Sequence, residues 1–64
     1  MVKINGEQFD AAGTALAEFL EREGYDNSRL AVERNGAIVP KAQYGSTMLG
    51  DGDELEIVSF VGGG

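Results

Sequence analysis

The residues of this chain with the clearest chemical use are its last four, Val61-Gly62-Gly63-Gly64. Because glycine has no Cβ, such a stretch can lie in a channel too narrow for any other residue. Four extended residues reach about 13–14 Å, which is enough to enter the active site of another protein. The group delivered there would be the α-carboxylate of Gly64, which is ionised at neutral pH and can act as a nucleophile. The same composition also suits a frayed end or a cloning remnant, so the rest of the chain must decide between them.

The remaining residues do not assemble into catalytic machinery. The 64 residues include no Cys and no His, which removes thiolate nucleophiles, disulfides and the usual general base near neutral pH. Neither a Ser/His/Asp arrangement nor a pair of catalytic carboxylates emerges. We therefore expect a protein that is not an enzyme and that binds no cofactor of its own.

An acidic turn at Asp51, Asp53 and Glu54 could attract Ca²⁺ or Mg²⁺, because these hard cations take carboxylate oxygens. Its spacing lacks the twelve-residue ligand pattern of an EF-hand. Gly50-Asp51-Gly52 is also followed by neither the Lys nor the helix start that a phosphate-binding loop requires. We interpret this segment as a turn with solvated acids and predict no metal site.

The charge balance limits the kinds of partner. Eleven acidic residues against five basic ones give a net charge of −6. This disfavours nucleic acid and anionic membranes, and it favours a basic protein partner, although acidity can also serve solubility alone. No apolar run approaches the length of a signal segment or a membrane span, so a soluble, cytoplasmic protein, monomeric when alone, is the default expectation.

Two strands and a helix are predicted in the first part of the chain. Alternating apolar residues predict a strand over residues 2–4, and Asn5-Gly6 is a strong hairpin signal before a returning strand at 7–10. Thr14 is predicted as the N-cap of a helix that ends at Gly24. Its apolar face consists of Leu16, Phe19 and Leu20.

Three strands are predicted in the second part. A strand around Leu30 and Val32 is followed by a second hairpin signal, Asn35-Gly36, and by a strand at 37–39 that Pro40 should end. A short helical turn is expected within residues 43–47, with three neighbouring residues covering the core. These are Tyr44, Met48 and Leu49. The last strand is predicted over residues 55–61.

The predicted order is therefore β-β-α-β-β-β in one α+β domain at residues 1–61, followed by a flexible glycine tail at 62–64. A single helix with one apolar stripe must cover one face of a mixed sheet. With the last strand beside the first, this arrangement is a β-grasp, or ubiquitin-like, fold.

The last strand also predicts an interaction surface. If Leu55 and Ile57 face the core, alternation puts Val58 and Phe60 on the opposite face, directly before Val61 and the tail. Exposed apolar residues at such a position indicate a protein-binding patch, which Ala31 on the neighbouring strand could extend. The alternative is that Phe60 folds back over the edge of its own core.

Three segments together resemble the ThiS family of sulfur carriers. Residues 30–41 resemble its "xAVxxNGxxVPR" signature, residues 50–58 resemble its "DGDxxEIV" segment, and the end resembles its diglycine terminus with one more glycine. The resemblance covers essentially the whole chain. Two positions depart from the usual pattern, with Tyr44 in place of Trp and Lys41 in place of Arg, and both keep the character of the residue.

The resemblance implies a mechanism and a set of partners. An E1-like adenylating enzyme of the ThiF type would use ATP to adenylate the carboxylate of Gly64. A sulfur donor protein would then displace AMP to leave a thiocarboxylate, from which a ThiG-type thiazole synthase would take sulfur for thiamine. Two alternatives stay open: a carrier that serves molybdopterin, cysteine or another product, and a non-covalent ubiquitin-like binding module.

Overall fold

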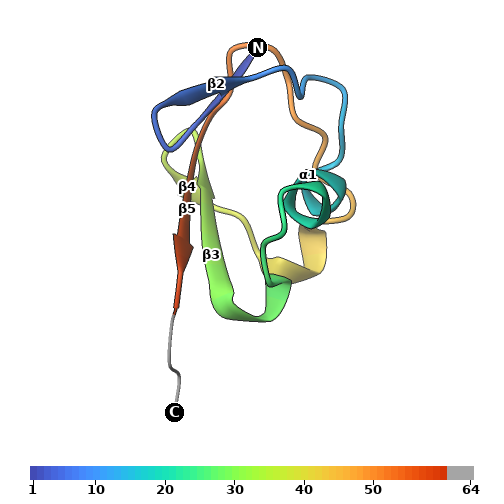
Figure 1. Cartoon of the computed structure of the whole chain (residues 1–64), viewed down its shortest axis with the longest axis vertical. Helices are drawn as coiled ribbons and strands as arrows, with labels where there is room; N and C mark the ends of the chain where they lie inside the picture. Colours follow the sequence, from blue (N-terminus) through green and yellow to red (C-terminus); the bar gives the residue numbers. More distant parts are fainter. Residues whose placement is uncertain (61–64) are drawn as a thin grey trace.

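The computed structural model describes residues 1–60, and these form one five-stranded sheet with a helix on one face (Figure 1). The elements in chain order are β1 (Val2–Ile4), β2 (Glu7–Phe9), α1 (Leu16–Arg22), the 3₁₀ helix η1 (Asn27–Arg29), β3 (Leu30–Arg34), β4 (Ala37–Ile38), the 3₁₀ helix η2 (Lys41–Gln43) and β5 (Glu54–Ser59). The strand order is β2-β1-β5-β3-β4. β5 lies parallel to β1 and antiparallel to β3, so the predicted mixed β-grasp sheet is confirmed. Residues 61–64, predicted as the end of the last strand and the tail, lie outside the described residues.

Both predicted hairpins are confirmed by backbone geometry. Asn5 and Gly6 have φ values of 51° and 83°, and Asn35 and Gly36 have values of 52° and 87°. Positive φ at both central residues defines a type I′ turn, whose twist matches that of the flanking strands. These turns fix the register of β1 with β2 and of β3 with β4.

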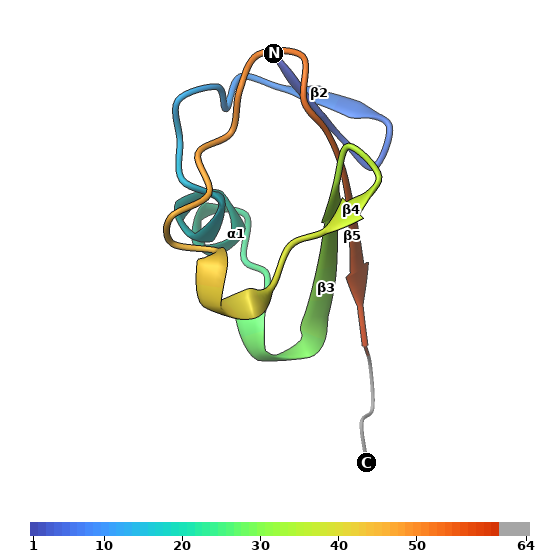
Figure 2. The same cartoon turned by 180° about the vertical axis from the view of Figure 1, so that it is seen from behind.

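The helix begins differently from the prediction, whereas its end agrees with it. α1 starts at Leu16, Ala15 occupies the N-cap, and no side chain caps this end, so the assignment of Thr14 was wrong. Tertiary contacts replace the local cap. The N–H of Leu16 donates to the carbonyl of Thr47 at 2.8 Å, and the carbonyl of Thr14 accepts from the N–H of Leu49 at 2.9 Å. The segment after η2 thus runs beside the start of α1 (Figure 2).

Gly24 ends the helix as predicted. It has a φ of 84°, and its N–H donates to the carbonyl of Glu21 at 3.1 Å. The N–H of Tyr25 donates to the carbonyl of Leu20 at 2.9 Å. This pair of bonds is the Schellman motif, which satisfies carbonyls that the last turn leaves free.

The core fills the space between the sheet and α1. Phe19 is fully buried there and contacts Phe9 edge-to-face, with ring centroids 5.2 Å apart. Tyr44 and Leu49 are buried as predicted, but Met48 is 53% exposed, which contradicts the prediction. Met48 pairs through its backbone with Ala15, and neighbouring side chains in such an extended segment point to opposite sides.

The predicted helical turn within residues 43–47 is confirmed, because the N–H groups of Ser46 and Thr47 donate to the carbonyl of Gln43 at 3.1 and 3.0 Å. A 3₁₀ helix that was not predicted, η2, precedes this turn at Lys41–Gln43, with Pro40 at its N-cap position. Pro40 itself is extended, with a φ of −61° and a ψ of 142°, and the helical conformation begins at Lys41. β4 ends one residue before the predicted boundary. None of the helices within residues 1–60 has the length and apolar character needed to cross a membrane.

Candidate functional site on the outer face of the last strand

The sheet face opposite α1 presents the predicted apolar patch. Val58 is 55% exposed and Phe60 is 57% exposed, while Leu55 and Ile57 on the inner face are buried. Ala31 is half-buried directly opposite Val58 in the register of β3 with β5. The predicted orientation of the strand is confirmed, and the alternative in which Phe60 covers its own core is wrong. The part of these residues in binding a partner stays a prediction.

Phe60 is held at the margin of the sheet through its backbone. Its N–H donates to the carbonyl of Arg29 at 2.7 Å, which continues the β3–β5 ladder by one residue. The direction in which the chain leaves the sheet is therefore set as far as Phe60. The other predicted site residues, Val61, Gly62, Gly63 and Gly64, lie outside the described residues.

The side chain of Asn5 holds one edge of β5. Pairing of β1 with β5 ends at Ile4 opposite Leu55. Beyond that point, Asn5 Oδ1 accepts from the N–H of Ile57 at 2.8 Å, and Asn5 Nδ2 donates to its carbonyl at 3.2 Å. The amide thus stands in for the next residue of a strand beside β5 after β1 has turned away.

The side chain of Asn35 holds the other edge. Its Oδ1 accepts from the N–H of Glu54 at 2.9 Å, and its backbone N–H donates to the Glu54 carbonyl at 2.8 Å. The sequence pattern predicts both asparagines only as turn residues. A signal for the second role was available, because an amide both donates and accepts, whereas the aspartate that often occupies such turns only accepts.

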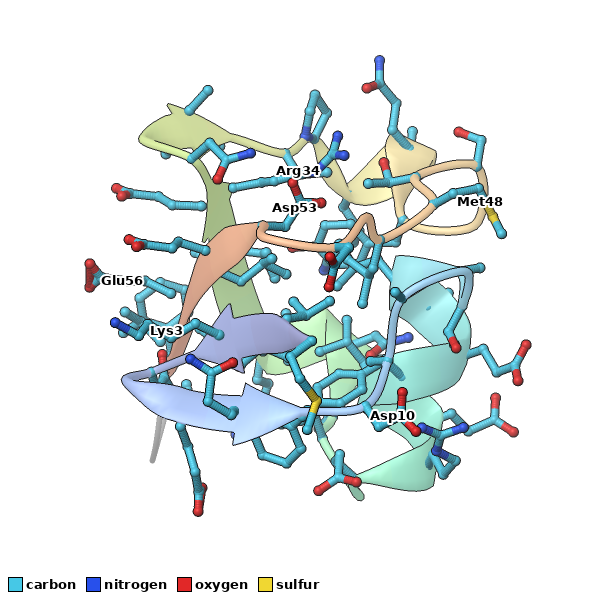
Figure 3. The ribbon with its side chains drawn as sticks, turned by 90° about the horizontal axis from the view of Figure 1, so that it is seen from above. Lys3, Asp10, Arg34, Met48, Asp53 and Glu56 are labelled. Carbon is cyan, nitrogen blue, oxygen red and sulfur yellow. The ribbon has the colours of Figure 1, made fainter. Side chains whose placement is uncertain are left out.

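The prediction that all acids of the turn are solvated is wrong for Asp53. Its side chain is only 13% exposed, and Oδ2 accepts from Arg34 Nε at 2.9 Å and from the Gly50 N–H at 2.8 Å. Oδ1 accepts from Asn35 Nδ2 at 3.1 Å. Burial alone would raise the pKa of Asp53, but the hydrogen bonds from Gly50, Asn35 and Arg34 outweigh it and hold the pKa below its ordinary value. Asp53 and Arg34 thereby join the start of β5 to the end of β3 (Figure 3).

The neighbouring Asp51 forms an ion pair with the N-terminal ammonium of Met1. Within residues 1–60 no group of three or more acidic side chains is placed to hold a metal ion. The turn therefore braces the sheet through Asp51 and Asp53.

Comparison with known proteins identifies the family of this chain. A family model described as the ThiS family matches residues 2–64. The chain belongs to the ThiS family. The sulfur carrier protein ThiS of Bacillus subtilis is 37% identical over 67 residues, and the match covers 100% of both chains.

Two further relatives of this ThiS-family chain are much longer. The thiazole synthases of Paramagnetospirillum magneticum and Magnetococcus marinus are 48% and 42% identical to it. The match covers 95% and 98% of this chain but only 19% and 20% of those proteins. The chain therefore spans about a fifth of their length.

A solved structure agrees with the fold. The crystal structure of ThiS from Geobacter metallireducens has a TM-score of 0.77 and 28% sequence identity, with 98% of this chain and 97% of that one covered. The ubiquitin-like β-grasp architecture expected from the resemblance is thus confirmed. Within the ThiS-family fold of this chain, Ala31, Val58 and Phe60 lie together on the outer face. Val58 lies in β5, Phe60 directly follows that strand, and the glycines come after Val61 in the sequence.

Proposed function

We propose that this chain is a sulfur carrier of thiamine biosynthesis whose Gly64 carboxylate is activated and then converted to a thiocarboxylate. The observation that carries the proposal is the strand β5. The strand is held on both edges by Asn5 and Asn35. Val58 within it and Phe60 directly after it are exposed to solvent, and the glycines follow in the sequence. The full-length similarity to a sulfur carrier protein ThiS supports it.

In the proposed first step, a carboxylate oxygen of Gly64 attacks the α-phosphorus of ATP. The new P–O bond gives an acyl-adenylate, and pyrophosphate leaves with the electrons of the broken bond. In the second step a sulfide-level sulfur nucleophile, supplied by a donor protein, attacks the carbonyl carbon. The C–O bond to AMP breaks, AMP leaves, and a C-terminal thiocarboxylate remains.

The two steps divide the chemistry between this chain and its partners. A carboxylate is a poor electrophile, and the mixed anhydride supplies the leaving group that sulfur displaces. ATP is bound and used by an E1-like adenylating enzyme, so the carrier supplies only the acyl group. The chain has no Cys, and therefore no internal thiol can intercept the acyl-adenylate.

Thiazole synthase is the proposed recipient of the sulfur. Two thiazole synthases contain a region similar to almost the whole of this chain, so a related region and the rest of the synthase share one polypeptide. A carrier that works with a ThiG-type synthase agrees with that arrangement. Delivery to molybdopterin or cysteine would instead leave thiazole formation unaffected by loss of the carrier.

Intact mass spectrometry of the chain isolated from its own cells tests the proposal. The expected species carries sulfur in place of one oxygen at Gly64. Oxidation of Met1 or Met48 adds nearly the same mass, so fragmentation must assign the change to the last residue. A second measurement uses the chain after incubation with the activating enzyme, ATP and a sulfur donor. If mass spectrometry finds only the unmodified carboxylate there as well, the proposal is contradicted and a non-covalent module is favoured.

A further inference from the structure

A charged hollow lies on the outer face of the sheet, beside the apolar patch. It has a volume of about 750 Å³ and is bordered by the two Asn-Gly turns. Its ionisable side chains are Lys3, Glu33, Glu54 and Glu56, so the hollow is lined by three carboxylates and one ammonium group. Figure 3 shows Lys3 and Glu56 pointing from the sheet to the side opposite the helix. The face is thus open to an approaching protein.

Two of these carboxylates lie side by side on neighbouring strands, on the same face of the sheet. Glu33 and Glu56 are directly opposite in the register of β3 with β5. Directly opposite residues have Cβ atoms roughly 4.5–5.5 Å apart, and like charges at such positions destabilise the sheet. The ion pairs formed within residues 1–60 involve Asp26, Asp51 and Asp53, so neither glutamate is neutralised there. Lys3 is beside Glu54 in the β1–β5 register, also without an ion pair within residues 1–60.

The carboxylate pair adjoins the apolar patch without a gap. Val58 is the next outward residue along β5 after Glu56, and Ala31 is the next outward residue along β3 beside Glu33. A protein that covers Ala31 and Val58 must therefore also cover this pair. Removing two adjacent carboxylates from water without a counter-charge is strongly unfavourable. The partner surface needs a cation at this point.

We propose that the enzyme that adenylates the carrier places an arginine side chain in the hollow, bridging Glu33 and Glu56. The inference rests on the proposed function. The guanidinium has five N–H donors in a planar fork and can bond two carboxylates at once, which the point charge of lysine does less well. The enzyme must also gather ATP and a carboxylate, both anionic, so a positively charged contact surface suits its chemistry.

The test compares Glu33→Gln, Glu56→Gln and the double variant with the wild type. Glu21→Gln, on the exposed side of α1, is the matched control because it changes the net charge equally. Each outer-face variant is expected to raise both the dissociation constant from calorimetry and the KM for the carrier in ATP–pyrophosphate exchange about tenfold. We expect kcat to stay unchanged, and Glu21→Gln to alter neither constant more than about twofold.

Two further results identify the bridge. The double variant should weaken binding by much less than the product of the single effects, because both carboxylates act through one guanidinium. Glu56→Gln should also raise the melting temperature while it weakens binding, since the repulsion from Glu33 is removed. A residue with a merely structural role would show the opposite change in stability.

Several outcomes would overturn the inference. Unchanged dissociation constants in the outer-face variants, with normal exchange, would remove it and leave the carrier function intact. An equal effect of Glu21→Gln would show diffuse charge attraction instead, and fully multiplicative effects would show two separate cations. No exchange with wild-type carrier would contradict the proposed function itself, and the inference would fall with it.

Discussion

The side-chain amide of Asn5 forms hydrogen bonds with both the N–H and the carbonyl of Ile57, fifty-two residues along the chain. The same residue has a positive φ in the first hairpin turn. The backbone of Asn5 therefore forms part of the turn between β1 and β2, while its side chain holds β5. A mutation of Asn5 should therefore also disturb β5 at Ile57.

Substitution of Asn5 by glycine separates the two roles. Glycine keeps the positive φ but removes both bonds to Ile57, so we expect the free energy of unfolding to fall by about 1–3 kcal/mol. Urea unfolding measures this change. Gly6→Ala is the control for the turn alone, because a Cβ at Gly6 meets no atom within 4 Å and only the backbone is strained. An Asn5→Gly protein as stable as the wild type would show that the amide contributes nothing.

Asp53 should make the stability fall in acid. Its pKa is lower in the folded chain than its ordinary value of 3.8, so folding favours the ionised form. This contribution is fully present above the ordinary pKa and is lost as the pH falls through the lower, folded pKa. Urea unfolding at a series of acid pH values should show the loss, and Asp53→Asn should flatten the curve in this range.

Asp26 adds a second contribution of the same sign. Hydrogen bonds from the hydroxyl and the N–H of Ser28 lower its pKa. Asp26→Asn is therefore the matched comparison for Asp53→Asn. If Asp53→Asn leaves the acid limb as steep as in the wild type, its contacts with Arg34 and Gly50 do not stabilise the ionised carboxylate.

Local signals sufficed for the strands and turns of this chain. The two Asn-Gly pairs and the period-two alternation of Leu55 and Ile57 are read over a few residues, and the structure agrees with both. The start of α1 could not be read in this way. Its free N–H groups are satisfied by the carbonyls of Tyr44 and Thr47, which are distant in sequence.

Those features of the candidate site that depend on local alternation were predictable from the sequence, and those that depend on distant contacts were not. Exposure of Val58 and Phe60 follows from alternation alone. The opposition of Glu33 and Glu56 depends on the register of β3 with β5, and the burial of Asp53 depends on where Arg34 lies. Such relationships join segments that are distant in the sequence, and no local pattern contains them.

The apolar patch should serve binding more than stability. Phe60→Ser is expected to weaken the complex with the adenylating enzyme by about tenfold or more, because exposed aromatic residues often dominate interface energies. The melting temperature should change little, since Phe60 is 57% exposed and lies outside the core. Met48→Ser is the control, because Met48 is similarly exposed but lies beside Ala15 at the start of α1. A collapse of the melting temperature in Phe60→Ser would show that the ring stabilises the fold.

The proposed reaction at Gly64 predicts a strict requirement for a free, narrow end. Gly63→Val adds a β-branched side chain beside the reacting group, and it should block adenylation if the enzyme admits the end through a channel that fits only glycine. Deletion of Gly64, or addition of residues after it, should have the same effect. ATP–pyrophosphate exchange measures the loss, and the melting temperature should match that of the wild type in each variant. Because Gly45→Val adds the same side chain at a position where a Cβ meets no atom within 4 Å, it serves as the control and should exchange normally. Normal exchange by Gly63→Val, or full activity of a chain with a blocked C-terminus, would show that the reacting group lies elsewhere.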